Sequence, residues 1–185
     1  MTNVELKETL FEGVVSFRRS SDWLQPLRMK ADELPLHHEE FVKRAVMPGG
    51  CRRRFVTDST RLVLDVEPTT DELPRPFDLT TDEERLEAVI VEPGSGKAEF
   101  KNLPVIGKPL EIWLPTHHPT RIRGLSIDDD AHLRAAPDDR PKWVTYGSSI
   151  SHCRAAHSPS RTWPAVAARL RGLNLTSLGY GGNCH

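Results

Sequence analysis

Proline most limits how the first two thirds of this chain can fold. Eleven of its 15 prolines lie between residues 26 and 119. Proline lacks a backbone N–H and its ring clashes with the preceding helical turn, so this spacing leaves little room for long helices. Between the prolines, apolar residues alternate with polar ones, as at Leu62, Leu64 and Val66, which is the period of a strand. This part of the sequence therefore predicts short β-strands.

Further runs with β-strand character are separated by glycine- and proline-rich turns. They are Phe11–Phe17, Leu86–Val91, Leu110–Leu114 and Arg121–Ile127. Five or more short strands without convincing helices predict an all-β sandwich of the jelly-roll kind. We therefore expect a β-sandwich accessory domain over residues 1–125, followed by a polar linker over residues 126–141.

The distribution of charge changes near the end of that linker. All 26 acidic residues precede residue 142, together with 20 of the 25 basic ones, so residues 1–141 have a net charge of −6. The whole chain has a net charge of −1, which argues against general binding to nucleic acid or anionic membranes.

Other large-scale features are also lacking in the sequence. No apolar run approaches the roughly 20 residues of a membrane span, and the N-terminus does not resemble a signal peptide. Three cysteines are too few for a disulfide scaffold. We expect a cytoplasmic globular protein whose oligomeric state the sequence leaves open.

From residue 142 the sequence takes the pattern of a parallel α/β unit. Trp143–Tyr146 is a short β-prone run and Leu173–Leu178 is a second one. Between them, Thr162 can cap a helix that has Pro164 in its first turn. The apolar residues of that helix share one face: Trp163, Val166, Ala167 and Leu170. The order of strand, helix and strand predicts the opening of a βαβ fold.

Ligands of parallel α/β sheets bind at the carboxyl ends of the strands. The loops at these ends are Gly147–Ser151 and Gly179–His185. Because both open at the same edge of the sheet, we expect serine hydroxyl groups beside a loop rich in backbone N–H groups.

These two loops resemble the motifs of SGNH (GDSL-type) hydrolases. Tyr146-Gly147-Ser148-Ser149-Ile150 resembles the Gly-Asp-Ser-Ile/Leu block of that family, and Gly181-Gly182-Asn183 resembles its second block. The Trp-Pro pair that opens the helix is similar as well. Residues 1–125 resemble the carbohydrate-module-like β-sandwich that precedes the catalytic domain in one branch. The resemblance implies that residues 142–185 begin an SGNH-type, flavodoxin-like α/β hydrolase domain.

The resemblance implies a serine esterase, acyl hydrolase or acyltransferase that forms an acyl-enzyme on Ser149. Gly182 would supply an N–H to the oxyanion hole, together with the N–H of Ser149, while Ser148, Gly181 and Asn183 would line the binding site. The substrate would be an acyl ester of a small molecule or glycan, and no cofactor or metal is expected. This chemistry needs a hydroxyl presented at a tight turn and oxyanion donors that are fixed in advance.

The sequence departs from the family pattern at two points. The aspartate of the first block is replaced by Ser148. The Gly-x-Asn-Asp block and the Asp-x-x-His block are absent, and no acidic residue follows residue 141. A serine without its base keeps only a small part of the catalysed rate. We therefore expect a fragment that stops within the catalytic domain, and we expect this 185-residue chain to be inactive.

Two alternatives remain open at this point. Both loops could be ordinary βα turns in which Ser148 or Ser149 caps the next helix. The chain could also be a non-catalytic carbohydrate-binding module, with Trp23 and Trp113 stacking on sugar rings, although tryptophan packs more often in a core.

Other polar clusters suggest further hypotheses. Five residues near the two loops offer nitrogen and sulfur ligands for zinc, but their spacing fits no zinc motif. They are His152, Cys153, His157, Cys184 and His185. Two of them, Cys153 and Cys184, are expected to be free thiols that approach one another.

Basic and histidine-rich stretches in the first segment are interpreted as surface. We expect Arg52–Arg54 to be a solvated strand edge and both histidine pairs to lie in surface loops. The pairs are His37-His38 and His117-His118.

Overall fold

The computed structural model describes residues 1–70, 72–105 and 107–183. The strands are β1 (Thr2–Val4), β2 (Phe11–Glu12), β3 (Ser16–Arg19), β4 (Leu24–Leu27), β5 (Arg52–Thr57), β6 (Leu62–Val66), β7 (Arg75–Thr80), β8 (Arg85–Val91), β9 (Lys97–Phe100), β10 (Leu110–Trp113), β11 (Ile122–Ile127), β12 (Leu133–Ala135), β13 (Lys142–Gly147) and β14 (Asn174–Gly179). The helices are α1 (Glu39–Ala45), α2 (Ser149–His152) and α3 (Trp163–Leu170), and short 3₁₀ turns lie at Glu8–Leu10, Leu34–Leu36 and Pro159–Arg161. No helix in these described ranges is long and apolar enough to cross a membrane.

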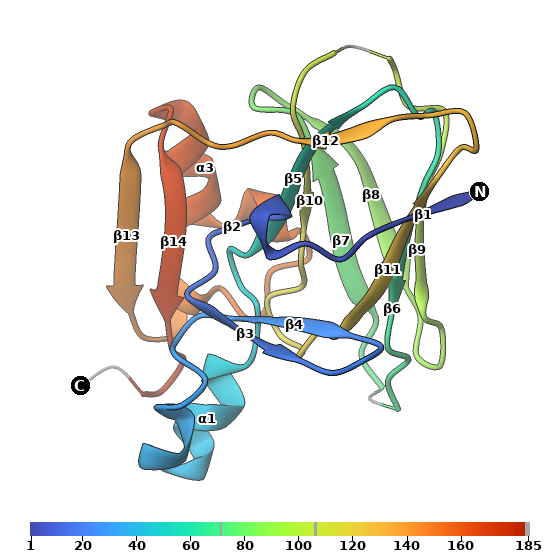
Figure 1. Cartoon of the computed structure of the whole chain (residues 1–185). Helices are drawn as coiled ribbons and strands as arrows, with labels where there is room; N and C mark the ends of the chain where they lie inside the picture. The colour runs from blue at the N-terminus through green and yellow to red at the C-terminus, as the bar shows by residue number, and fades with distance from the viewer. Residues whose placement is uncertain (71, 106, 184–185) are drawn as a thin grey trace.

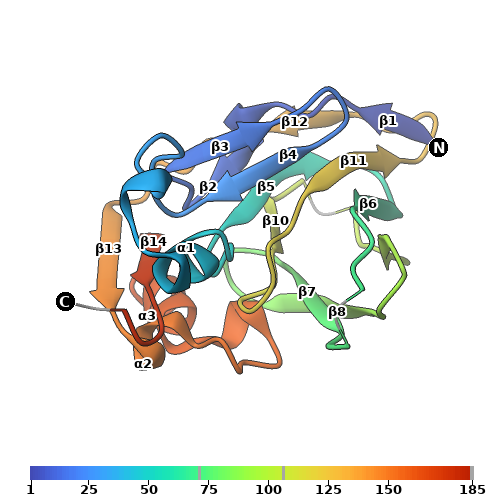
Figure 2. The ribbon, with the colours of Figure 1, turned by 90° about the horizontal axis from the view of Figure 1, so that it is seen from below.

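Strands β1 to β12 form two antiparallel sheets that face each other (Figures 1 and 2). One sheet has the order β3-β4-β11-β6-β9, with β1 pairing with β11. The other has the order β12-β5-β10-β7-β8, with β2 pairing with β5. We call this part the two-sheet body. The expectation that the chain is mostly β-structure is confirmed.

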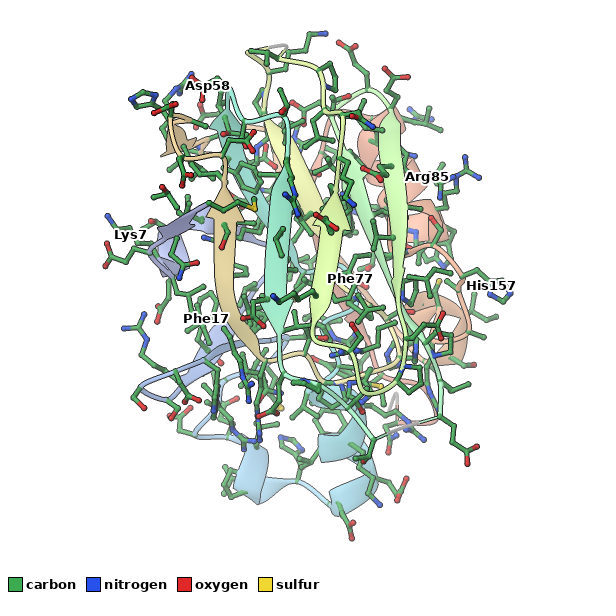
Figure 3. All side chains as sticks on the ribbon, turned by 90° about the vertical axis from the view of Figure 1, so that its right-hand side faces the viewer. Lys7, Phe17, Asp58, Phe77, Arg85 and His157 are labelled. Atoms are coloured by element: carbon green, nitrogen blue, oxygen red, sulfur yellow. The ribbon has the colours of Figure 1, made fainter. Side chains whose placement is uncertain are left out.

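The space between the two sheets is filled by apolar side chains from both. Phe55 and Phe77 of one sheet and Phe100 of the other are fully buried in a single cluster. Figure 3 shows Phe77 among the ribbons, while Lys7 and Asp58 point outward. Burial of one phenylalanine side chain contributes about 1.5–3 kcal/mol, so this cluster is the main source of stability in the two-sheet body.

The strands with clear alternation are found where the sequence predicts them. Leu62–Val66 is β6, and the three later runs correspond to β8, β10 and β11. The prediction of one strand over Phe11–Phe17 is wrong, because the chain breaks at Gly13, which has a φ of +71°. A Cβ at Gly13 would lie 2.6 Å from the carbonyl oxygen of Gly50, so the close packing of these segments requires glycine.

Helix α1 is absent from the sequence-based expectation. His38 caps it, since its side chain accepts a hydrogen bond from the N–H of Phe41. Phe41 then packs on Tyr180, with ring centroids 4.8 Å apart. Figures 1 and 2 show α1 near the end of β14. Its position depends on an aromatic contact with a residue far away in the sequence, which local periodicity does not reveal.

The stretch 126–141, expected as a polar linker, contains the end of β11 and the whole of β12. Strand β12 pairs with β5, from Leu133–Thr57 to Ala135–Phe55. The side chain of Asp138 is fully buried and binds Arg52 and Arg140. Much of this stretch is therefore packed into the two-sheet body.

Residues 142–183, which we call the C-terminal unit, contain a two-stranded parallel sheet. Strands β13 and β14 pair in register from Lys142–Asn174 to Gly147–Gly179, and α3 lies in their connection. Trp143 of β13 and Trp163 of α3 make an edge-to-face contact at 6.3 Å. Ala165, Ala168 and Leu175 form a small core with Trp113 of the two-sheet body.

The expectation that Arg52–Arg54 is a solvated strand edge is wrong. All three side chains are buried in β5, which lies inside its sheet. Arg52 and Arg54 both bind Glu111 at 3.1 and 2.8 Å, while Arg53 packs over the ring of Phe11 at 5.7 Å. Burial of these cations is tolerated because acids from distant segments pair with two of them.

Buried arginines also cover the outer edge of β14. On the side away from β13, the Leu175 carbonyl accepts a bond from Arg52 at 3.0 Å. The carbonyls of Ser177 and Gly179 accept bonds from Arg28 at 3.4 and 2.5 Å. An unpaired strand edge exposes backbone groups that need partners. At β14, guanidinium groups of the two-sheet body supply them in place of another strand.

Candidate active site

Ser149 stands at the turn that follows β13. It is the first residue of α2 and is exposed to solvent. Two glycines allow α2 to pack tightly on the strand ends. A Cβ at Gly147 would overlap the side chain of Ser151, and a Cβ at Gly179 would overlap the backbone of His152. The result is a strand-to-helix turn that presents a serine at the carboxyl edge of the sheet.

The glycine-rich loop after β14 lies directly beside this turn. Tyr180 donates its N–H to the carbonyl of Gly147 at 2.8 Å. A Cβ placed on Gly181 would lie 3.8 Å from the Cα of Ser149. The structure thus brings together the two loops that the sequence analysis placed at one edge.

Ser148 and Gly182 are hydrogen-bonded to each other. The N–H of Gly182 donates to the Oγ of Ser148 at 3.0 Å. Ser148 occupies the N-cap position of α2 but makes no side-chain capping bond. Its hydroxyl instead accepts the hydrogen bond from the neighbouring loop. Asn183 folds back on the same loop, and its side-chain amide donates to the carbonyl of Gly181 at 2.9 Å.

The side chain of His152 is hydrogen-bonded to the glycine-rich loop. Its side chain is buried, and Nδ1 accepts the N–H of Gly181 at 3.1 Å. Because Nδ1 is an acceptor, Nε2 carries the proton and donates to the carbonyl of Thr116 at 2.9 Å. Burial, together with the nearby Arg28 guanidinium, lowers the pKa of His152 to about 3. A neutral imidazole therefore links the loop beside Ser149 to the two-sheet body.

The positions of the proposed zinc ligands do not support a metal site in the described part of the chain. Both ring nitrogens of His152 already bind the protein, and the thiol of Cys153 donates to the carbonyl of Ile150 at 3.0 Å. Among residues 1–70, 72–105 and 107–183, no group of three or more His, Cys, Asp or Glu side chains could hold a metal ion. Cys184 and His185, and with them the expected approach of two thiols, lie outside the described residues.

A cavity of about 900 Å³ opens at Ser149. On one side it is lined by Ser149, Ile150 and Gly181 of the C-terminal unit. On the other side it is lined by Leu73 and Pro74 just before β7, by Pro76 of β7 and by Ile90 of β8. A volume of this size accommodates a small organic ligand. No sequence motif marks the second wall, because its residues come from strands far away in the chain.

His117 lies in the loop between β10 and β11, so its expected loop position is confirmed, and it also lines this cavity. It is half-buried, and burial is the main cause that lowers its pKa. His37 and His38 are exposed, as expected. Figure 3 shows His157, a further residue of the cavity lining, on the same side of the molecule as Arg85 of β8.

The two tryptophans considered for sugar stacking have different surroundings. Trp113 is buried, and its indole N–H donates to Thr80 at 3.1 Å. The more common fate of tryptophan, core packing, is thus confirmed for Trp113. Trp23 is half-buried and lies beneath the guanidinium of Arg121 at 4.7 Å.

Comparison with known proteins gives relatives among solved structures only. No protein-family model and no curated protein matches the chain. The salicylyl-acyltransferase SsfX3 from a tetracycline biosynthetic pathway is 32% identical, with a TM-score of 0.88 over 99% of this chain. A protein described as a GDSL-like lipase from Bacteroides ovatus is 24% identical, with a TM-score of 0.73 over 99% of this chain. An acetyl xylan esterase, Est2A, from the rumen bacterium Butyrivibrio proteoclasticus is 12% identical, with a TM-score of 0.61 over 98% of this chain.

These relatives are longer than this chain. It spans 56% of the acyltransferase, 57% of the GDSL-like lipase and 48% of the xylan esterase. At 24% and 12% identity, the likeness to the last two is one of fold. The chain therefore shares its fold with about half of an acyltransferase, a lipase-like protein and an esterase, which supports the expected relation to SGNH-type hydrolases.

Proposed function

We propose that Ser149 is the nucleophile of an SGNH-type acyl hydrolase or acyltransferase, and that this chain is part of a longer protein. The observation that carries the proposal is the position of Ser149. It stands exposed at a strand-to-helix turn, beside a glycine-rich loop and in the wall of a 900 Å³ cavity. The similarity to a solved acyltransferase over almost the whole chain supports the same chemistry.

In this reaction the Ser149 hydroxyl adds to the carbonyl carbon of an ester. A new C–O bond forms, the carbonyl electrons move to the oxygen, and a base takes the hydroxyl proton. Collapse of the oxyanion breaks the bond to the alcohol, which leaves with a proton. Water or a second alcohol then attacks the acyl-enzyme, releases the acyl group and restores the Ser149 hydroxyl.

Backbone N–H groups of Ser149 and Gly182 are the proposed oxyanion donors. In the structure the N–H of Gly182 donates to the Ser148 hydroxyl. The Ser148 oxygen thus occupies the position that we propose for the substrate oxygen. Rotation of Ser148 about χ1 would release this N–H to the substrate oxygen. The hydrogen bonds from Gly181 to His152 and from Asn183 to Gly181 fix the loop before the substrate arrives. Such fixed donors stabilise the charge that develops on the carbonyl oxygen.

We propose that the base of this site is not among the described residues. His152 cannot take the role, because both of its ring nitrogens are engaged with the protein. We propose that the base and its acidic partner belong to the remainder of the longer protein. Exposed apolar residues on β13 and α3 support an extension of the parallel sheet in that direction. They are Val144, Tyr146, Trp163 and Leu170.

The outer edge of β14 is closed by Arg28 and Arg52, so a further strand is expected to add beside β13. This would place β13 inside the sheet and Ser149 near the middle of its carboxyl edge. In open α/β sheets, ligands bind at such positions.

The test is hydrolysis of 4-nitrophenyl acetate and 4-nitrophenyl butyrate by the protein encoded by the complete gene. Ser149→Ala is expected to reduce the rate by at least about 10³-fold, because the acyl-enzyme cannot form. Ser151→Ala, in the same short helix, is the matched control and should retain activity. Activity that survives Ser149→Ala and depends on another residue would refute the assignment. The 185-residue chain alone is expected to show no turnover that depends on Ser149.

A further inference from the structure

Among the described residues, the charged side chains that line the cavity at Ser149 are all basic. Arg44 at the end of α1 and Arg154 just after α2 both line it, and neither Asp nor Glu is among its described lining residues. The chain as a whole contains 26 acidic and 25 basic residues. The described part of the lining, with two arginines and no acid, therefore contrasts with the rest of the molecule.

Both guanidinium groups are placed to receive a ligand. Arg154 is exposed to solvent at the cavity. Arg44 is 3.9 Å from Glu40, but Glu40 makes its shorter contact, 2.8 Å, with Lys43. At 3.9 Å, and with the Glu40 side chain 61% exposed, this ion pair contributes little, so it competes weakly with an incoming anion. Burial lowers the pKa of His117, which disfavours the charged form of that imidazole.

The remaining wall of the cavity is apolar although it faces solvent. Leu73 and Ile90 on one side are 57% and 58% exposed, and Ile150 on the other is 81% exposed. Pro74 and Pro76 continue the surface between the first two. Large apolar side chains that gather around one opening mark a binding surface. A ligand that covers them would remove this apolar area from water.

We propose that this site takes an acyl ester with an apolar body and an anionic group, and this inference rests on the function proposed above. Arg44 and Arg154 bind the anionic oxygens, for which a guanidinium offers paired donors in one plane. Leu73, Ile90 and Ile150 cover the apolar body. The oxygens of a carboxylate or of a phosphate ester would satisfy the same donors. A neutral sugar ester has no group that makes use of these two cations.

The test measures binding to the protein with three esters of similar size. The probes are 4-acetoxybenzoate, 4-acetoxyphenyl phosphate and the neutral 4-acetoxybenzamide, each titrated by calorimetry at low salt. At least one anionic probe is expected to bind about tenfold more tightly than the amide, as hydrogen bonds to a charged group allow. The tighter of the two anionic probes identifies the anion, and the preference should shrink as salt is added.

Variants locate the binding groups. Arg154→Gln and Arg44→Gln should each reduce the anion preference to within about twofold. Arg171→Gln, at an exposed arginine just after α3 and outside the cavity lining, should leave it unchanged. Ile90→Ser should weaken all three probes by a similar factor, and Val15→Ser, at an exposed apolar residue outside the cavity lining, should weaken none. Unchanged thermal unfolding would show that each variant folds.

The outcomes separate this inference from the proposed reaction. Equal binding of the anions and the amide, or a preference that survives both arginine variants, would overturn the anion site. Turnover that depends on Ser149 would still stand in that case. An anion preference lost in Arg154→Gln, in a protein that shows no Ser149-dependent turnover, would uphold the anion site and overturn the acyl-transfer reaction.

Discussion

Asp78 of β7 anchors the segment that runs from the cavity to α3. Its Oδ2 accepts three hydrogen bonds, from Ser158 Oγ at 2.5 Å, Ser160 N at 2.9 Å and Ser160 Oγ at 2.7 Å. Both Asp78 and Ser160 are fully buried. Both donors of Ser160 would therefore lose their partner away from solvent, while Ser158 is half-buried. We predict that Asp78→Ala destabilises the fold through the loss of these three bonds.

The expected loss is about 3 kcal/mol. Each donor left without a partner costs about 1 kcal/mol or more when it is buried, and three donors lose theirs. The carboxylate itself was costly to bury, which keeps the net effect below the gross strength of three charge-assisted bonds. Asp78→Asn retains an acceptor oxygen and should lose about half as much.

Urea unfolding followed by tryptophan fluorescence measures this loss. With a slope of about 2 kcal/mol per molar urea, Asp78→Ala should lower the midpoint by about 1.5 M. The matched control is Asp130→Ala, because Asp130 is exposed, and its effect should stay within about 0.5 kcal/mol. If Asp78→Ala also stays within 0.5 kcal/mol of the wild type, the bonds from Ser158 and Ser160 do not anchor this segment.

Three further predictions concern the C-terminal unit and its contact with the two-sheet body. Because the pKa of His152 is about 3 in the fold and about 6.5 in the unfolded chain, the unfolded state binds more protons between these values. Stability should therefore fall by up to about 1.4 kcal/mol per pH unit below pH 6.5, and urea titrations of His152→Asn should lack this slope. Arg52→Met should cost about 3 kcal/mol, because the Leu175 carbonyl loses its donor and Glu111 a partner. Gly179→Ala should prevent α2 from docking and lower the melting temperature far more than Gly94→Ala, whose added Cβ meets no neighbour within 4 Å although its φ is also strained.

Each of the three has an outcome that contradicts it. A flat pH profile between pH 6.5 and 4 in the wild type would mean that the His152 imidazole titrates normally in the fold. A melting temperature of Arg52→Met equal to that of the wild type would mean that the edge of β14 needs no guanidinium. Equal effects of Gly179→Ala and Gly94→Ala would mean that the close contact between β14 and α2 can relax.

Local patterns in the sequence predict those parts of the fold in which one face of a strand is apolar. Leu62, Leu64 and Val66 alternate with polar residues, and they are buried in β6 with none of their surface exposed. The same pattern fails at Arg52–Arg54, where three consecutive charged residues form a buried strand. Their partners Glu111 and Asp138 are 59 and 86 positions away from Arg52, so no short window contains both halves of the network.

The sequence likewise predicts one part of the candidate site and not the other. The turn around Ser149 and the loop around Gly182 are recognisable because each is a short motif at the end of a strand. The cavity that they share has its other wall near β7 and β8, where Leu73, Pro76 and Ile90 lie about 60 to 75 positions earlier in the sequence. Nothing in the residues around Leu73 or Ile90 indicates a neighbouring serine, so this wall could be found only in the folded structure.

The two-sheet body is part of the architecture of the candidate site and is not simply attached beside it. Arg28 and Arg52 supply the hydrogen bonds that a neighbouring strand would give to β14. Through Thr116, the same body holds His152, which in turn orients the loop of Gly181 next to Ser149. The edge of β14, the glycine loop and one wall of the cavity all depend on it. Under the function proposed above, a change in the two-sheet body would therefore alter how a substrate lies against Ser149. Reactivity at Ser149 and selection of its substrate are therefore expected to reside in different parts of one folded unit.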